Sequence, residues 1–366
     1  MLFALLAATR RWPVLRVGGT VLVHGPEEFR AALTRVPLDR TAAGTTGGAA
    51  GELAGAGALF DQQGAEHREA RRAAATLLGV AGVAELRPIW AKLLDDRLPV
   101  LGAGGTVDLV PLTAEIAGAT AAALLDLDVD PVELADAARS SAAAAARAHL
   151  PGLGARRAER AAATAAEQLL DLVAPHVLDL VDPSEAPEGQ ARPAAERPAP
   201  WGQRPAEAGF NSMLAVAAIN TTVAALPRAV AWVCDDTLWE HAGNPVLVDE
   251  LLRVTAATPL LPRVAAADSE VGGCPVKAGD RLLLIARHAA DAHRRDPGVD
   301  DPAPARTAQL VFGVGPHACP GAGLARAQLA DLLAALAPYR PVVVRARADR
   351  GSALPGWRSL VVRSSA

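Results

Sequence analysis

The segment Phe312–Gly321, with the sequence FGVGPHACPG, decides how the rest of the chain is interpreted. It contains three glycines, two prolines, one histidine and one cysteine between two apolar segments. Cys319 stands just before Pro320 and a predicted helix, whose unpaired backbone N–H groups and dipole favour a thiolate. The glycines allow a flat ligand to approach the backbone closely. The segment therefore sets Cys319 apart from Cys234 and Cys274, which are expected to be small buried hydrophobic residues.

Composition narrows the class of protein. The chain has 366 residues, of which 51% are hydrophobic, and is predicted to form a single domain over residues 1–366. The net charge of −4 gives no general attraction to nucleic acid or to anionic lipid, so neither is expected as a partner. Three cysteines without C-x-x-C spacing argue against a disulfide framework or a zinc site, and favour a reducing compartment.

The first residues, MLFALLAATRR, hold an apolar run that ends at Arg10 and Arg11. A run of about eight residues is well short of the roughly twenty needed to span a bilayer. We therefore expect no membrane anchor, no secretory signal and a cytoplasmic location.

Periodicity and turn chemistry predict a mainly α protein with small, mainly antiparallel β-sheets. A hairpin is expected over Val14–Val17 and Thr20–His24 because Gly18-Gly19 separates two β-type runs, and a short helix opens at Pro26. Further helices are predicted at 65–78, 84–94, 112–125, 131–149, 156–180, 209–233, 245–254 and 322–336, with a loop at 38–59, strands and turns over 264–285, an irregular stretch at 294–306, and a strand at 341–344. Pro227 is expected to kink the 209–233 helix or end its first half, and residues 182–206 form a proline-rich surface insert.

One competing interpretation of the cysteine segment is a dinucleotide-binding fingerprint. QLVFGVGPHA, followed by a helix and the strand PVVVRA, imitates the G-x-G-x-x-A pattern. However, the motif lies near the C-terminus, no βαβ series precedes it, and His317, Cys319 and Pro320 occupy the spacing between the glycines and the helix. The dinucleotide interpretation is therefore disfavoured.

FGVGPHACPG resembles the haem-binding loop of the cytochrome P450 family, F-G-x-G-x-H-x-C-x-G, at every defined position. The resemblance implies a cytochrome P450 fold with haem b (iron protoporphyrin IX) between a long distal helix and a proximal cysteine loop. It also implies that Cys319 is the axial ligand of the haem iron. By the same resemblance, His317 contacts a haem propionate, and Phe312, Gly313 and Gly321 belong to the loop that holds the haem.

A second motif resembles the family's E-x-x-R pair. Glu250 and Arg253 are three residues apart, which places both side chains on one face of a helix. The third member of that buried ion network normally precedes the cysteine loop, where Arg306 is the best candidate and Arg294 and Arg295 are alternatives.

Basic residues elsewhere resemble the family's propionate contacts. His67 and Arg71 match an H-x-x-x-R pair, whose spacing suits the clamping of a carboxylate. Arg263, in the segment PLLPR, resembles a further propionate arginine. Arg68 or Arg72 is expected to face an acidic redox partner.

The segment Ala217–Thr222, with the sequence AAINTT, resembles the family's distal A-G-x-D/E-T-T segment. By this resemblance Ala218 makes room for dioxygen, Thr221 hydrogen-bonds to it, and the position of Asn220 carries an acid that relays protons. Asn220 departs from that pattern, because an amide cannot titrate near neutral pH. Proton delivery then uses another path, is slower, or is not needed.

The resemblance covers most of the chain and implies a compact, soluble bacterial member of the family. The leading hypothesis is a monooxygenase that takes electrons from a ferredoxin and ferredoxin reductase and oxidises a small organic substrate of specialised metabolism. The alternative, motivated by Asn220 and Ala218, is an atypical catalyst that uses peroxide or performs coupling or rearrangement. A haem-binding sensor is a third possibility.

Overall fold

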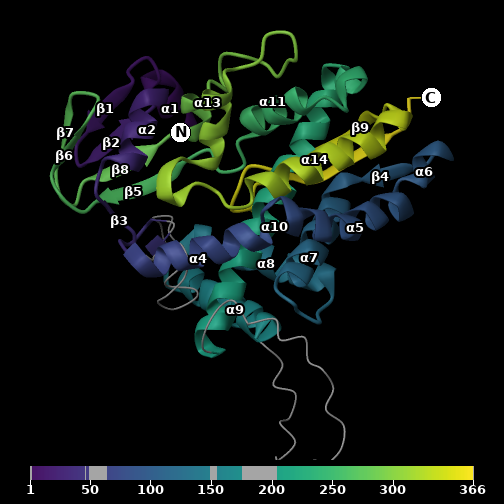
Figure 1. The fold of residues 1–366 in the computed structure, drawn as a ribbon, viewed down its shortest axis with the longest axis horizontal. Helices are drawn as coiled ribbons and strands as arrows, with labels where there is room; N and C mark the ends of the chain where they lie inside the picture. The colour runs from purple at the N-terminus through teal and green to yellow at the C-terminus, as the bar shows by residue number, and fades with distance from the viewer. Residues whose placement is uncertain (1, 46, 49–63, 149–154, 175–203, 366) are drawn as a thin grey trace, which may run out of the picture.

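The structure, a computed structural model, describes residues 2–45, 47–48, 64–148, 155–174 and 204–365. Its helices are α1 (Leu2–Thr9), α2 (Pro26–Thr34), α4 (Gly64–Leu77), α5 (Val80–Arg97), α6 (Pro99–Gly102), α7 (Leu109–Leu124), α8 (Pro131–Ala148), α9 (Ala155–Val173), α10 (Arg204–Asp235), α11 (Pro245–Thr255), α12 (Ala286–Ala289), α13 (Ala305–Ala308) and α14 (Ala322–Leu336). Its strands are β1 (Val14–Val17), β2 (Thr20–Val23), β3 (Leu38–Asp39), β4 (Thr106–Asp108), β5 (Leu261–Ala265), β6 (Ser269–Val271), β7 (Cys274–Val276), β8 (Arg281–Leu284), β9 (Val342–Ala348) and β10 (Trp357–Arg363). The prediction of a mainly α protein with small sheets is confirmed (Figure 1).

Local signals placed several of these elements correctly. The side chain of Asn244 accepts a hydrogen bond from the backbone N–H of Val246 at 2.9 Å, and Pro245 is the first residue of α11, as its sequence predicts. Helix α14 has the bounds expected of it. Helix α10 continues through Pro227, so of the two predicted outcomes, a kink or an end of the helix's first half, the second is wrong. Most of the proline-rich insert at 182–206 lies outside the described residues.

The main sheet, with the order β1-β2-β8-β5-β3, joins strands near the start of the chain to strands between residues 261 and 284. Strands β1 and β2 form the expected antiparallel hairpin, and β2 pairs in parallel with β8, which is an exception to the expected antiparallel pattern. Strand β3 was predicted to be part of a loop; it pairs through Leu38 with Ala265 of β5. This sheet and α2 form one end of the molecule, at the left of Figure 1.

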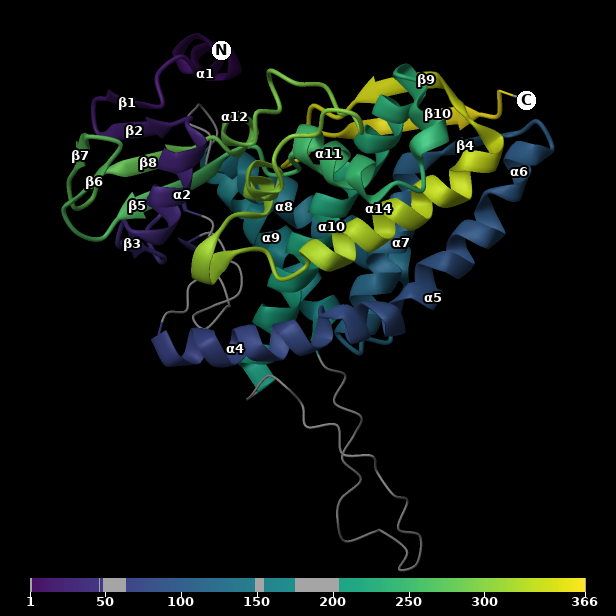
Figure 2. The same ribbon diagram turned by 45° about the horizontal axis from the view of Figure 1, so that its top comes forward.

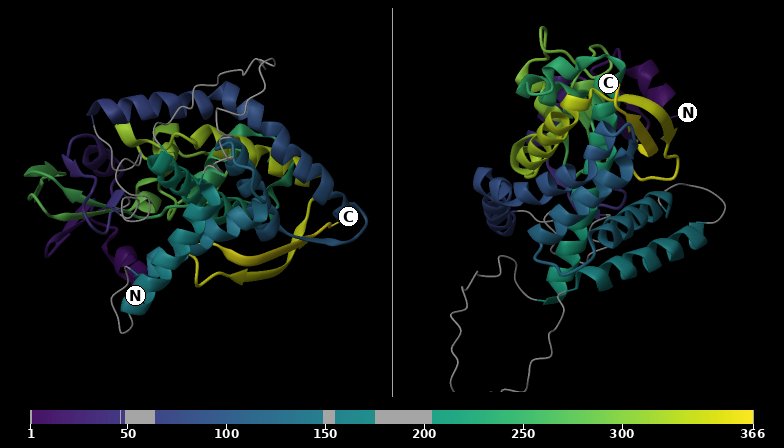
Figure 3. Two further views of the ribbon diagram at one scale, coloured as in Figure 1. Left: turned by 90° about the horizontal axis from the view of Figure 1, so that it is seen from below. Right: turned by 90° about the vertical axis from the view of Figure 1, so that its right-hand side faces the viewer.

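A second sheet, with the order β4-β10-β9, lies near the C-terminus. Strand β10 pairs antiparallel with both neighbours, and Val361 is opposite Asp108 of β4. The β9–β10 hairpin and helix α4 lie on opposite sides of the molecule when it is viewed from below (Figure 3, left). The two sheets share no strand, and the second sheet lies on the side of the molecule away from α4 (Figure 3, left).

Helix α10 is the central element of the core. At 1.5 Å per residue its 32 residues extend about 48 Å, and it packs against α7, α8, α9, α11 and α14. Within it, Ala208–Asp235 is long and apolar enough to cross a membrane by length and composition alone, but 56% of the most apolar window is buried inside the protein. Ile219, Leu226 and Val230 are fully buried in the main hydrophobic cluster. The apolar character of α10 is accounted for by its place in this core.

Three histidines are packed together where the N-terminal helix meets the main sheet. His24 follows β2, and its Nδ1 atom lies 2.7 Å from Nδ1 of His288 in α12. Its Nε2 atom lies 3.2 Å from Oγ1 of Thr9, at the end of α1. The rings of His24 and His288 are stacked with centroids 5.0 Å apart, and the ring of His293 lies 4.7 Å from that of His288. The cluster thus joins α1, the sheet and α12 through one set of polar contacts.

Candidate functional site

The cysteine loop has a backbone that the sequence FGVGPHACPG is suited to form. Gly313 and Gly315 have φ angles of +71° and +74°, a region that side chains disfavour. A Cβ atom on Gly315 would also lie 3.1 Å from Cγ2 of Thr34 in α2. The N–H of Cys319 donates a 2.7 Å hydrogen bond to the carbonyl of Phe312, which closes the loop before α14 begins.

Cys319 is exposed, whereas Cys234 is buried and Cys274 is half-buried. Although its surface is open on one side, desolvation by the surrounding protein raises the pKa of the Cys319 thiol. The N–H of Gly321 and the charges of Arg71 and Arg326 act in the opposite direction. The N–H groups at the helix start thus favour the thiolate as predicted, but desolvation has the larger effect on the pKa.

The predicted basic residues gather around this loop. Helix α4 carries His67, which is 5% exposed, and Arg71, whose Nη1 donates to the carbonyl of Ala318 at 2.5 Å. Desolvation lowers the pKa of His67, and the charge of Arg71 lowers it further. Desolvation also lowers the pKa of Arg263, in β5, to about 10. Thus α4 brings Arg71 to the cysteine loop, and the charge of Arg71 also acts on the neighbouring His67.

Arg40 is a basic residue that the sequence interpretation missed. It follows β3 and is half-buried, and desolvation lowers its pKa. Its charge also lowers the pKa of both His67 and Arg263, which places it close to the two predicted propionate residues. The pairing of β3 with β5 brings Arg40 toward Arg263. A two-residue strand at the start of a glycine-rich segment is hard to detect in a sequence, which is why Arg40 was missed.

The structure describes the surroundings of Phe312 and Gly321 but not the side chain of His317. The side chain of His317 lies outside the described part of the structure, so its propionate contact stays a prediction. Phe312 is half-buried, and the guanidinium carbon of Arg326 lies 5.0 Å from the centroid of its ring. A Cβ atom on Gly321 would lie 3.9 Å from Sγ of Cys319, so nothing in contact with this glycine excludes a small side chain.

The Glu250–Arg253 pair forms as expected and is almost completely buried, with side-chain exposures of 2% and 0%. Two hydrogen bonds join them: Nε of Arg253 donates to Oε1 at 2.9 Å, and Nη2 donates to Oε2 at 2.6 Å. Nη2 also donates to the carbonyls of Arg295 and Asp296 at 3.1 and 3.3 Å. The pair therefore fastens α11 to the segment that precedes the cysteine loop.

The expectation that Arg306 completes this network is wrong. Arg306 is exposed, and the further donor to Oε1 of Glu250 is the backbone N–H of Ala303 at 3.0 Å. The side chain of Arg295, one of the alternatives, is paired with Asp301. The segment folds directly over Glu250, so a backbone N–H takes the third position. Arg295 still takes part, because its carbonyl accepts from Arg253 and the charge of Glu250 acts on its guanidinium.

Three predicted distal residues lie in the middle of α10. The hydroxyl of Thr221 donates to the carbonyl of Ala217 at 2.8 Å, one turn earlier, and lies 3.3 Å from the carbonyl of Ala218. The amide of Asn220 donates to the carbonyl of Val216 at 2.8 Å and, across to α8, to the carbonyl of Ala138 at 3.2 Å. An ionised carboxylate could not donate to Ala138. The structure thus gives Asn220 a role in helix packing that the acid of the family pattern could not take.

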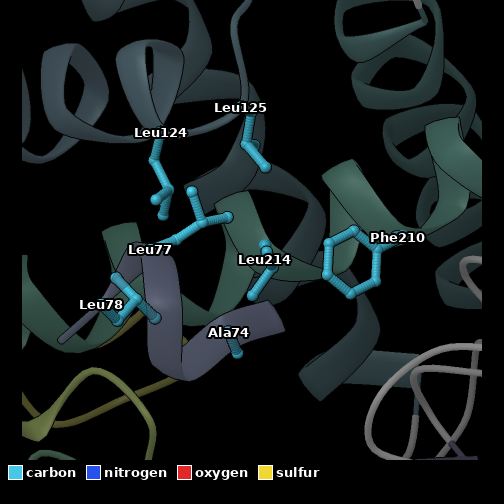
Figure 4. A pocket seen from close by; sticks show the side chains of 7 residues that line it. All are labelled: Ala74, Leu77, Leu78, Leu124, Leu125, Phe210 and Leu214. Carbon is cyan, nitrogen blue, oxygen red and sulfur yellow. The ribbon is translucent and has the colours of Figure 1, made fainter. Parts of the chain in front are cut away.

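Two small pockets adjoin these elements. One is lined only by apolar side chains of α4, the end of α7 and the start of α10, including Leu77, Phe210 and Leu214 (Figure 4). It lies where α4 rests on the core, so apolar contact positions the helix that carries His67 and Arg71 (Figure 2). The other pocket is more polar, and Asn220 and Arg139 line it.

These residues fit a haem. An exposed cysteine on a loop held from both sides supplies a soft sulfur ligand for iron. Arg40, Arg71 and Arg263 supply positive charge and His67 supplies an imidazole N–H, which together suit the two carboxylates of protoporphyrin IX. The donor set is therefore consistent with both the metal and the anionic edge of that cofactor.

Comparison with known proteins supports the same family. No family model matches the chain. It is 35% identical over 142 residues to 20-oxo-5-O-mycaminosyltylactone 23-monooxygenase of Streptomyces fradiae, covering 36% of this chain and 34% of that protein. It is 34% identical over 127 residues to mycinamicin VIII C21 methyl hydroxylase of Micromonospora griseorubida, covering 32% of each. The matched stretch thus spans about a third of the length of these curated relatives.

The solved structures cover the whole fold. A cytochrome P450 from Bacillus subtilis superposes with a TM-score of 0.74 over 99% of both chains at 18% identity. The fold expected from FGVGPHACPG is confirmed, and so is the resemblance on which it rested.

Proposed function

We propose that this chain, which has the cytochrome P450 fold, is a haem-thiolate monooxygenase. The observation that carries the proposal is the exposed Cys319 on a loop whose sequence matches the family's haem-binding pattern, next to a group of buried and half-buried basic residues. The reaction would consume dioxygen, two electrons and two protons, place one oxygen atom in the substrate and release the other as water.

The residues of the chain have separate tasks in this proposal. The bound haem would supply the oxidative chemistry at its iron. Cys319 would hold the iron from the proximal side, while Arg40, His67, Arg71 and Arg263 bind the propionates. His317 is proposed as a further propionate contact.

On the distal side we propose that Thr221 orients a proton-carrying water, because its hydroxyl sits in the middle of the central helix. Asn220 would not titrate, and its amide is engaged with Ala138. Proton delivery is therefore assigned to Thr221 and water. The names of the relatives support a monooxygenase and give no support to peroxide-driven, coupling or rearrangement chemistry.

The partners are inferred from chemistry and from the relatives. Arg68 and Arg72 are exposed on α4, the helix whose Arg71 holds the cysteine loop, so a ferredoxin with an acidic surface is the proposed electron donor. The relatives' names include a mycaminosyl lactone and mycinamicin VIII, so the proposed substrate is a small specialised metabolite of comparable chemistry. The single domain and the cytoplasmic location remain predictions.

The decisive test is the absorption spectrum of the reduced, carbon monoxide-bound protein reconstituted with haem. Wild type is expected to show the red-shifted Soret band of a thiolate-ligated haem, and Cys319→Ser is expected to lose it. A wild-type spectrum without that band would remove Cys319 as the ligand and with it the proposed function.

Turnover separates a monooxygenase from the other hypotheses. With NADPH, ferredoxin and ferredoxin reductase, one atom of isotopically labelled dioxygen is expected in the product, as measured by mass spectrometry. 20-oxo-5-O-mycaminosyltylactone and mycinamicin VIII are the first probes, and a shift of the iron spin state reports their binding. Product that forms with peroxide but never with dioxygen and the electron donor would contradict the assignment.

A further inference from the structure

Arg326 lies in the second turn of α14 and contacts two other parts of the site. Its guanidinium carbon is 5.0 Å from the centroid of the Phe312 ring, a distance typical of a cation–π contact. Its Nε atom donates to Oδ1 of Asp249, in α11, at 2.5 Å. The side chain therefore joins the start of the cysteine loop to the helix that carries the buried Glu250–Arg253 pair.

The two ends of the cysteine loop are held by two different arginines. Arg71 contacts the carbonyl of Ala318, next to Cys319, while Arg326 contacts Phe312, whose carbonyl accepts the N–H of Cys319. The positive charges of both arginines act on the sulfur of Cys319. They differ in their surroundings, because Arg326 has a carboxylate partner in Asp249, which weakens its field.

We propose that Arg326 is a positioning residue that stabilises negative charge on the Cys319 side of the haem, and that Asp249 sets how much of its charge is effective. The inference rests on the proposed haem-thiolate function and goes beyond it, because the E-x-x-R, propionate and distal residues do not include either side chain. The Arg326–Asp249 pair would tune how readily the haem accepts its first electron.

The sign of each effect follows from elementary electrostatics. Reduction adds an electron beside the thiolate, and a nearby cation favours the added charge. Removing the cation should lower the equilibrium constant for reduction, while removing the carboxylate should raise it. The pair is 32% and 44% exposed, so solvent screens both effects, and a change of roughly three- to tenfold is expected in each direction.

The experiment is a spectroelectrochemical titration of the haem-loaded protein. Arg326→Gln should lower the reduction equilibrium constant, whereas Asp249→Asn should raise it; for this one-electron couple a tenfold change corresponds to about 59 mV. Arg326→Lys keeps the charge without the planar guanidinium and should stay close to wild type. Arg97→Gln removes an exposed arginine paired with Glu115 between α5 and α7, and it serves as the control with no expected shift.

The outcomes separate this inference from the proposed function. Opposite shifts in Arg326→Gln and Asp249→Asn, with the thiolate band intact, support it. Unchanged potentials with an intact thiolate band overturn the inference about Arg326 and Asp249 and leave the monooxygenase proposal standing. A shift in Arg326→Lys as large as that in Arg326→Gln has the same consequence. If Arg326→Gln does not take up haem, the absence of a positive shift in Asp249→Asn is sufficient to overturn it.

Discussion

The buried histidine cluster predicts that this protein loses stability in mild acid. Desolvation lowers the pKa of His24 to about 4, and the charge of His293 adds to this effect. Desolvation likewise lowers the pKa of His288 to about 4, assisted by His293, His24, Arg10 and Arg287. Both side chains are buried, at 3% and 9% exposure, so the folded protein strongly favours their neutral forms.

Most charged groups around the cluster lower the pKa values of its histidines. The pKa of His293 is lowered by desolvation and by Arg294, Arg10 and Arg287, while Asp291 raises it. Protonation therefore adds positive charge to a site that is already surrounded by arginines. Once both rings are protonated, the contact between the two Nδ1 atoms also loses its acceptor, because an imidazolium can only donate.

The magnitude follows from proton linkage. A histidine with a pKa of 6.5 in the unfolded chain and about 4 in the folded one contributes its full stabilisation above about pH 6.5 and loses it as the pH falls toward 4. Between about pH 7.5 and pH 5 this amounts to roughly 2 kcal/mol for each such histidine. Two histidines give roughly 4 kcal/mol, a large part of the stability of an ordinary domain.

The assay is urea unfolding followed by far-ultraviolet circular dichroism at a series of pH values. His288→Gln removes one titrating group, so its loss of unfolding free energy between about pH 7.5 and pH 5 should be smaller than that of wild type by roughly 2 kcal/mol, whatever its stability at neutral pH. His241→Gln, outside the cluster, should retain the wild-type dependence. If His288→Gln and wild type show the same slope against pH, the cluster is not the source of the acid lability.

Three further predictions concern the core, the cofactor and helix packing. Glu250→Gln leaves its buried arginine partner without a counter-charge and should lower the free energy of unfolding by about 3–5 kcal/mol, measured by urea denaturation; a loss below 1 kcal/mol would contradict it. Arg71→Gln should weaken haem binding about tenfold in a titration with hemin, with Arg87→Gln as a control, and equal affinities would refute the assignment. Gly118→Ala places a Cβ atom 1.9 Å from a backbone carbonyl of α8 and should cost about 3 kcal/mol or more, whereas Gly243→Ala, which meets nothing within 4 Å, should be nearly neutral; equal thermal midpoints would contradict this.

The sequence predicted those parts of the site that depend on neighbouring residues. The FGVGPHACPG loop could be recognised because its glycines, its cysteine and the helix that follows form one local unit. The E-x-x-R pair and the cap at Asn244 are likewise encoded within one turn of helix. Such features depend on spacing, which a sequence displays directly.

The parts that were missed depend on how distant segments converge. Arg40 approaches Arg263 because β3 pairs with β5, which is more than two hundred residues away in the sequence. Arg306 was predicted from its place in the irregular stretch before the cysteine loop. The further donor to Glu250 is instead a backbone N–H, which has no sequence signature. Strand β10 was not predicted, because its burial depends on pairing with β4 and β9.

The parallel pairing of β2 with β8 has a consequence for the order in which the protein is made. Thr20 lies opposite Arg281, so the first hairpin emerges from the ribosome long before its partner strand exists. Closing a loop of this length costs about 5 kcal/mol of chain entropy, which local contacts do not offset. During synthesis, Val21 and Val23, fully buried in the finished sheet, lack their neighbours in β8 until that strand has been made. A ribosome-bound chain that ends before β8 should therefore be selectively sensitive to proteolysis at this hairpin.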